Sequence, residues 1–194
     1  NESKVSTIGA IITFRNNLIR PVDGKTGLQR FVGLQHIESH TGRKIGEDWV
    51  LAEDLQGRKF KFSAGEIVYG YLRPYLNKVW IADGDGICSV DQYVLQVKPE
   101  LIDTDYLAYF MRGPHFLQKT NELTHNLMLP RLRSGFLESI EIPIPNISKQ
   151  KKIVEALDNL RLKSEAIKNL QSTTQAELDA LLPAILDKAF RGEL

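Results

Sequence analysis

The sequence predicts an α+β protein in which a globular mixed-sheet domain is followed by a long, coiled-coil-forming α-helix. Short apolar segments with turn residues between them fill most of the chain before residue 98, as is typical of strands. Apolar residues at helical spacing follow, and a heptad repeat runs through the C-terminal part. We therefore expect a globular domain at residues 1–146 and a helix at 147–194.

The expected strands are short and lie in the first half of the chain, at residues 31–37, 59–62, 66–70, 78–82 and 89–97. The sequence DGDG at 83–86 predicts a tight turn between the last two. A helix begins after Asp103 or Thr104 as N-cap, because Tyr106, Leu107 and Phe110 then share one face. A second short helix is expected to start at Pro114.

The last expected strand runs through Ile140, Ile142 and Ile144, and Pro143 and Pro145 end it because proline cannot donate to a ladder. A helix then begins with Ser148 as N-cap and contains no further proline or glycine until Pro183. Residues 148–182 would span roughly 52 Å as a helix.

Apolar residues recur along this helix at the spacing of a coiled-coil seam. The apolar seam positions are Ile153, Leu157, Leu160, Ile167, Leu178, Leu181 and Ile185, with polar Ser164, Gln171 and Thr174 between them. These residues predict a helix–helix interface. The alternative is a single amphipathic helix that lies on its own domain.

Composition excludes few functions. The chain has 25 Lys and Arg against 24 Asp and Glu, a formal charge of +1 that does not indicate nucleic-acid binding. Cys88 is the single cysteine, which excludes an internal disulfide. The apolar runs of the chain are shorter than the roughly 18 residues of a membrane span, and no signal peptide is recognised. We expect a cytoplasmic protein without membrane contact.

No motif for catalysis or metal binding is recognised. The sequence DGKTG at 23–27 lacks the first glycine of a phosphate-binding loop, since Ile19 occupies that place. A calcium loop with Gly86 as its invariant glycine would place Gln92 where a glutamate is needed. His36 and His40 lack a third ligand at suitable spacing. We expect a binding protein with no catalytic residue and no metal.

Six segments together resemble one known family, the specificity subunits of type I restriction-modification enzymes. They are FVGLQHIESHTGRKIG (31–46), FSAGEIVYGYLRPYLNKVWIADGDGICSVDQYVLQVKPE (62–100), YLAYFMRGPHF (106–116), LPRL (129–132), IPIPNISKQKKIVEALD (142–158) and LLPAILDKAFRGEL (181–194). The combination of LRPYLNK, IPIP and AFRGEL is specific. The sequence Ser148-Lys149-Gln150 differs from the usual Ser-Glu-Gln of the family.

The resemblance implies a non-catalytic subunit of a prokaryotic enzyme that recognises double-stranded DNA. It also implies partners, namely methyltransferase subunits that use S-adenosylmethionine and a restriction subunit that uses ATP and Mg²⁺, with no cofactor bound by this chain. Full subunits carry two recognition domains and two antiparallel spacer helices, whereas this chain resembles one of each. It is therefore half of a subunit, a fragment, or a short subunit that forms a homodimer or joins a second half.

Cations and amides in loops are the candidate DNA contacts, since Arg, Lys, Asn and Gln read base edges and bind phosphates. They are Arg15, Asn17, Arg20, Lys25, Arg30, Arg43, Lys44, Arg73, Tyr75, Asn77, Lys78, Arg131 and Arg133. The segment 15–30 is favoured for reading bases, because LRPYLNK is shared by family members that read different sequences. The alternative for each cation is that it is only a solvated surface residue. The alternative for LRPYLNK is that it belongs to the structural framework of the fold.

One function of another class stays open from the residues alone. The chain could be a coiled-coil assembly protein whose globular head binds protein. Salt-dependent retention on duplex DNA separates the two, because phosphate binding weakens steeply with salt.

Overall fold

A computed structural model describes residues 4–24, 26–124 and 128–192. The chain forms two compact units that meet between Lys151 and Lys152. The first unit contains the sheets and the short helices, and the second consists of most of one long helix.

Three sheets make up the first unit. The small sheet pairs β1 (Lys4–Thr7) with β11 (Glu141–Ile144). The second has the order β2 (Ile12–Phe14), β10 (Gln92–Val97), β7 (Ile67–Gly70) and β8 (Val79–Ile81). The third has the order β3 (Leu18–Ile19), β6 (Lys59–Phe62), β9 (Gly86–Cys88), β4 (Leu28–Val32) and β5 (Asp48–Leu51). β4 and β9 run parallel and the other pairs are antiparallel, so the sheets are mixed as predicted.

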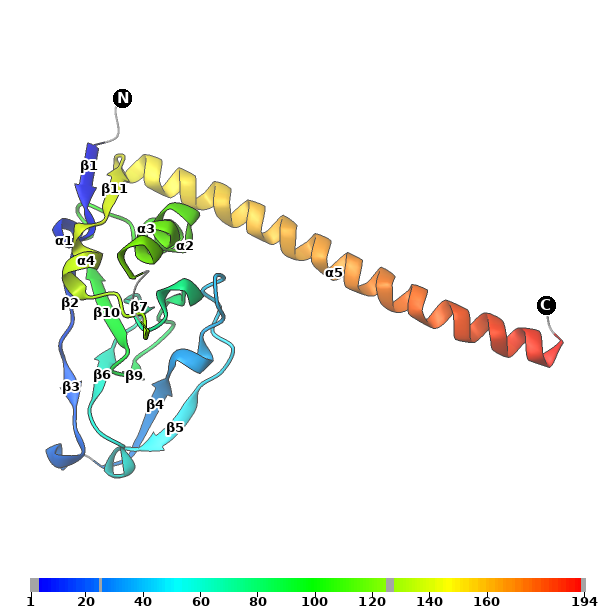
Figure 1. The fold of residues 1–194 in the computed structure, drawn as a ribbon, viewed down its shortest axis with the longest axis horizontal. Helices are drawn as coiled ribbons and strands as arrows, with labels where there is room; N and C mark the ends of the chain where they lie inside the picture. The colour runs from blue at the N-terminus through cyan, green and yellow to red at the C-terminus, as the bar shows by residue number, and fades with distance from the viewer. Residues whose placement is uncertain (1–3, 25, 125–127, 193–194) are drawn as a thin grey trace. The chain divides into compact units, whose positions relative to one another are not determined.

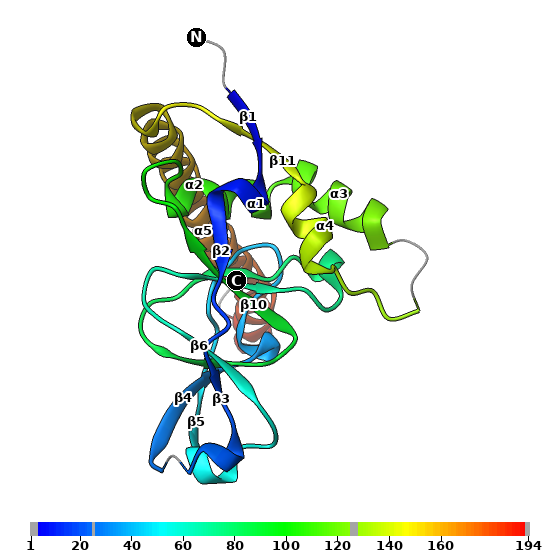
Figure 2. The ribbon, with the colours of Figure 1, turned by 90° about the vertical axis from the view of Figure 1, so that its left-hand side faces the viewer.

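Short helices lie between and beside the strands. They are α1 (Ile8–Ile11), α2 (Thr104–Arg112), α3 (Pro114–Thr124) and α4 (Ser134–Ser139), with 3₁₀ turns η1 (Pro21–Asp23), η2 (Leu34–His36), η3 (Ala52–Asp54) and η4 (Pro74–Leu76). Figures 1 and 2 show the five-stranded sheet at one end of this unit and helices α2, α3 and α4 towards the other.

Aromatic contacts join these layers. The rings of Phe62 on β6 and Trp80 on β8 meet edge to face at 5.4 Å and join the two larger sheets through one buried cluster. The ring of Tyr69 on β7 meets that of Phe116 on α3 at 5.7 Å. Both contacts bury large apolar rings, which is the main source of stability in such a core.

Most predicted elements of this unit are confirmed within a few residues. β6, β7, β8 and β10 lie in four of the five expected segments, and α2 and α3 begin where expected. Asp103 is the N-cap of α2, since its carboxylate accepts the backbone N–H of Tyr106. The prediction for 31–37 is wrong after Val32, where Gly33 donates its N–H to Nδ1 of His36 and closes turn η2. β1, β2, β3, β5 and β9 were not among the predicted strands.

The two prolines before the long helix act differently from the expectation. Pro143 does not end the strand but lies within β11, opposite Val5. Proline is allowed at this position because each strand of a two-stranded sheet has one edge without a partner strand. The proline nitrogen, which carries no hydrogen, can face that edge. The strand ends at Ile144, and Pro145 follows it.

The long helix α5 spans Ile147–Arg191. Its N-cap is Asn146 rather than Ser148, because the Asn146 side chain accepts the N–H of Lys149 at 2.9 Å. The helix continues through Pro183 and ends at Arg191, within the expected segment 147–194. Gly192, with φ of +73°, follows its last residue and donates its N–H to Ala189. No helix among the described residues has the length and hydropathy required to cross a membrane.

Candidate nucleic-acid interface

An open groove of about 450 Å³ lies on the five-stranded sheet. It is lined by residues from the segment 15–30 and from neighbouring strands, namely Arg15, Asn17, Leu28, Gln29, Arg30, Trp49, Lys61, Phe62, Ser63, Asp85, Gly86 and Ile87. Three candidate DNA contacts, Arg15, Asn17 and Arg30, therefore meet at one site. The fold brings them together because the carbonyl of Asn17 accepts the N–H of Lys61 on β6, and β9 joins β6 to β4 in the sheet.

The groove combines amide groups with exposed apolar side chains. Asn17 is exposed and Gln29 is half-buried. Leu28 and Trp49 are 61% and 60% exposed, and the antiparallel register of β4 and β5 places Trp49 opposite Arg30. Asn and Gln can form two hydrogen bonds to adenine, and apolar groups can contact the thymine methyl. The groove thus carries both kinds of group that read a base edge.

Arg15 is anchored at one side of the groove. Its Nη1 donates to Oε1 of Glu66 at 2.8 Å and to the Ser63 hydroxyl at 2.9 Å. Glu66 is almost completely buried and also accepts the Ser63 N–H and the Gln96 amide. A buried carboxylate needs such partners, so Arg15 has a structural role as well as a place in the groove.

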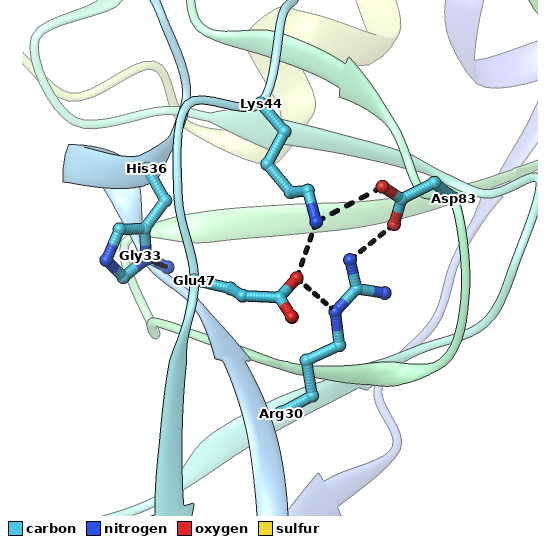
Figure 3. Close-up of polar contacts among 6 residues, drawn as sticks. All are labelled: Arg30, Gly33, His36, Lys44, Glu47 and Asp83. Atoms are coloured by element: carbon cyan, nitrogen blue, oxygen red, sulfur yellow. Dashed lines mark hydrogen bonds and ion pairs between the residues drawn. The ribbon is translucent and has the colours of Figure 1, made fainter.

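Arg30 and Lys44 belong to a four-charge cluster that Figure 3 shows. Arg30 donates through Nε to Glu47 at 2.7 Å and through Nη2 to Asp83 at 2.5 Å. Nζ of Lys44 contacts the same two carboxylates, at 2.5 Å and 3.2 Å. The cluster joins β4, the segment before β5 and the turn before β9. Its formal charges cancel, and the Arg30 side chain is only 13% exposed.

The cluster shifts the pKa of Arg30, Glu47 and Asp83 in the directions that favour their charged forms. Burial alone would lower the pKa of Arg30, but the hydrogen bonds to Asp83 and Glu47 raise it. Hydrogen bonds from Lys44 and Arg30 lower the pKa of Glu47. Burial acts to raise the pKa of Asp83, and the bonds from Arg30 and Lys44 outweigh it and lower that pKa. Arg30, Glu47 and Asp83 are therefore held in their charged forms.

The candidates in LRPYLNK separate into two groups. Arg73 and Tyr75 are exposed, whereas Asn77 is 1% exposed and donates its amide to the carbonyl of Arg112. Lys78 donates to the carbonyl of Leu34 at 2.6 Å, and burial lowers its pKa. The prediction that Asn77 lies on a DNA-contacting surface is thus wrong, because its side chain ties a left-handed turn to α2.

The remaining candidates lie on loops. Arg20 is exposed before η1, and Arg43 is exposed but bonded to Glu38 at 3.0 Å. Arg131 and Arg133 are exposed on either side of Leu132. Lys25 lies outside the described residues.

Sequence reasoning missed Leu28 and Trp49, the exposed apolar residues of the groove. Residues 48–51, DWVL, form β5. The aromatic Trp49 and the β-branched Val50 were the signal that could have indicated this strand. The segment is only four residues long, which is why its alternation was too short to recognise.

The seam of the long helix is a separate candidate interface. Leu160, Ile167, Leu178, Leu181 and Ile185 are exposed, while Ile153 and Leu157 are half-buried. A second open groove, of about 460 Å³, is lined by seam residues together with Leu170 and Gln175. Leu170 is an exposed apolar residue of this face that the heptad reasoning left out.

Comparison with known proteins decides the family of the chain. A family model described as the type I restriction modification DNA specificity domain matches residues 45–178. The chain belongs to this family. Both the expected family and the expected fold class are therefore confirmed.

Curated relatives in this type I specificity family are longer. The chain is 35% identical over 159 residues to the EcoDI specificity subunit of Escherichia coli, covering 82% of this chain and 35% of the relative. It is 27% identical over 108 residues to the StySPI specificity subunit of Salmonella potsdam, covering 55% and 23%. The chain thus spans about a third or less of these relatives.

Solved structures of type I specificity proteins share the fold. A chain from a study of complex assembly and conformational transition of the type I R-M system superposes with a TM-score of 0.85 at 18% identity, over 97% of this chain and 49% of that one. The HsdS subunit of Thermoanaerobacter tengcongensis gives 0.79 at 17% identity, over 92% and 46%. One recognition unit with its helix corresponds to about half of each.

Proposed function

We propose that the chain recognises one half of a bipartite double-stranded DNA target for a type I restriction-modification enzyme. The observation that carries this proposal is the groove of Asn17, Gln29 and Trp49 on a chain whose family is described as a DNA specificity domain. The first unit is the DNA-binding part.

The chemistry of the groove suits reading bases rather than transforming them. Amide side chains both donate and accept hydrogen bonds, so Asn17 and Gln29 can distinguish adenine from guanine at a base edge. The cations beside them are held by carboxylates, Arg15 by Glu66 and Arg30 by Glu47 and Asp83. We assign no catalytic residue to the chain.

Catalysis belongs in this proposal to partner subunits. A methyltransferase subunit would use S-adenosylmethionine, and a restriction subunit would use ATP and Mg²⁺. The specificity chain would direct these subunits to a particular DNA sequence. The family to which the chain belongs supports this division of labour.

The long helix would pair with a second helix, from another copy of this chain or from a second half-subunit. The exposed seam supports this pairing, because apolar side chains at heptad spacing are stabilised by a facing helix. The chain also corresponds to about half of the solved relatives. Antiparallel pairing of two copies has a two-fold axis, so the two heads would bind inverted half-sites.

The test is target selection from random duplex DNA, with and without the methyltransferase subunit encoded beside this gene. We expect enrichment of a bipartite site with an unread spacer. The chain alone should neither methylate nor cleave the selected DNA in the presence of S-adenosylmethionine, ATP and Mg²⁺. Recovery of no preferred sequence in either arm would contradict the proposal, as would methyl transfer by the chain alone.

A further inference from the structure

Two loops far apart in the sequence are joined edge to edge in the first unit. The backbone N–H of Arg73 donates to the carbonyl of Pro130 at 2.8 Å, and the N–H of Leu132 donates to the carbonyl of Tyr71 at 3.0 Å. The hydroxyl of Tyr93 donates to the carbonyl of Leu132, and its ring stacks on that of Tyr71 at 4.3 Å. The loops 71–77 and 129–133 therefore form one rigid surface over a tyrosine pair.

This surface carries several arginines. Arg73 and Arg133 are exposed, and neither guanidinium contacts a carboxylate within the described part of the chain. Arg131 is 52% exposed and lies 3.6 Å from Asp91, a distance that allows only a loose ion pair. Glu138 on α4 is another acid near the tyrosine pair.

The same surface is bonded to the segment that follows β9. β6 and β9 pair Phe60 with Cys88, and Val90 follows that pair by two residues on the chain leaving β9. The carbonyl of Val90 accepts the hydroxyl of Tyr71 at 2.8 Å. Burial raises the pKa of Tyr71, and the nearby Asp91 carboxylate adds to this.

The backbone of Arg73 is held in a costly conformation. Its φ and ψ are +53° and +62°, and it precedes Pro74. A residue before proline normally avoids helical conformations, and left-handed backbone favours glycine over residues with a side chain. A large cation at such a position indicates that its side chain has a use that outweighs the strain.

The groove and the arginine surface are linked by β9 and the residues that follow it. Ile87 of β9 lines the groove, and Val90, three residues further along the chain, accepts the Tyr71 hydroxyl. Three residues of chain span at most about 10 Å, which is well within one turn of B-DNA, about 34 Å. A duplex in the groove can therefore reach both.

We propose that Arg73, Arg131 and Arg133 form a phosphate-binding surface that positions duplex DNA over the groove without reading its sequence. This inference rests on the proposed function. It separates phosphate contacts from base contacts. A guanidinium without a carboxylate partner can donate two parallel hydrogen bonds to one phosphate. Arg15, Arg30 and Lys44 are instead already bonded to carboxylates. Phosphate contacts fix register, and base contacts specify sequence.

The test replaces Arg73, Arg131 and Arg133 with Gln together and measures duplex binding over a range of salt concentrations. Each phosphate contact contributes about 0.9 to the slope of log K against log salt, so the slope should fall by about 2 to 3. The preferred sequence should stay the same. A matched triple variant, Lys149→Gln with Arg161→Gln and Arg191→Gln, removes three exposed cations elsewhere and should keep the wild-type slope.

Failure of this surface and failure of the proposed function give different results. If the wild-type chain binds no DNA at low salt, with or without the methyltransferase subunit, both are overturned. If wild type binds and the arginine variant keeps the full slope, only the phosphate surface is overturned. If that variant instead loses affinity for the methyltransferase subunit alone, the surface binds an acidic protein and the assignment to DNA is wrong.

A second variant separates binding from folding. Arg73→Gly removes the guanidinium and also relieves the left-handed backbone, so the melting temperature should be equal to or above that of wild type. DNA affinity at a fixed salt concentration should nevertheless fall several-fold. A framework role for Arg73 predicts a lower melting temperature, and unchanged DNA affinity would contradict the phosphate assignment.

Discussion

The side-chain carbonyl of Gln150 accepts the backbone N–H of Asp103 at 2.8 Å, which joins the first turn of α5 to the N-cap of α2. The amide of Gln150 also donates to the carbonyls of Leu101 and Pro145. Gln150 is fully buried, and its one side chain satisfies three backbone groups. The start of the long helix is thereby fixed within the first unit.

Replacing Gln150 with Leu should destabilise the first unit by about 2–4 kcal/mol, because it removes three hydrogen bonds to the backbone and leaves the buried carbonyl of Pro145 without this partner. Chemical denaturation followed by circular dichroism measures this loss. Gln56→Leu is the matched control, since Gln56 is exposed and should change the free energy of unfolding by less than about 0.5 kcal/mol. Equal stability of the two variants would show that the Gln150 network does not stabilise the fold.

The charge cluster of Arg30, Lys44, Glu47 and Asp83 should make stability depend on pH. The folded-state pKa of both carboxylates lies below the unfolded value, so the stabilisation is present above about pH 4 and is lost as pH falls through the folded pKa. Thermal melts of wild type and of Glu47→Gln with Asp83→Asn should therefore differ at pH 6 and converge towards pH 3. A constant difference across this range would contradict the prediction.

Asn17 and Gln29 are predicted to carry sequence readout. Changing either to Ala should reduce discrimination at one base pair by about 1–3 kcal/mol and leave the salt dependence unchanged. Competition binding with single-base variants of the selected target measures the effect. Asn121→Ala, on α3, is the control and should leave every base preference intact. Loss of affinity for all sequences alike would instead assign Asn17 and Gln29 to backbone contacts.

The seam of α5 is predicted to hold two helices together. Leu160→Asp with Leu178→Asp should shift a dimer to monomer, because each carboxylate would be buried without a partner. Light scattering at micromolar concentration follows this change. Asn169→Asp with Thr173→Asp adds the same charge off the seam and should preserve the dimer. A wild-type chain that stays monomeric at high concentration would refute the pairing.

Sequence alone determined the features that depend on local periodicity. Alternation placed β6, β7, β8 and β10, and a single capping residue placed α2 at Asp103. The family also followed from the sequence, because its motifs are ordered along the chain. The extent of α5 was nearly predictable, since few helix breakers occur in it, although capping by Asn146 rather than Ser148 required the geometry of the turn.

Tertiary structure alone decided which polar residues are available for binding. Arg30 and Arg73 look equivalent in the sequence, yet one is bonded to Glu47 and Asp83 and the other is exposed without a described carboxylate partner. Asn77 was buried by its contact with the carbonyl of Arg112, 35 residues away. Such contacts depend on side chains that the sheets bring together from distant segments, and no local pattern records them. The sequence therefore determined which elements form, whereas long-range packing decided which of their charges remain open to a ligand.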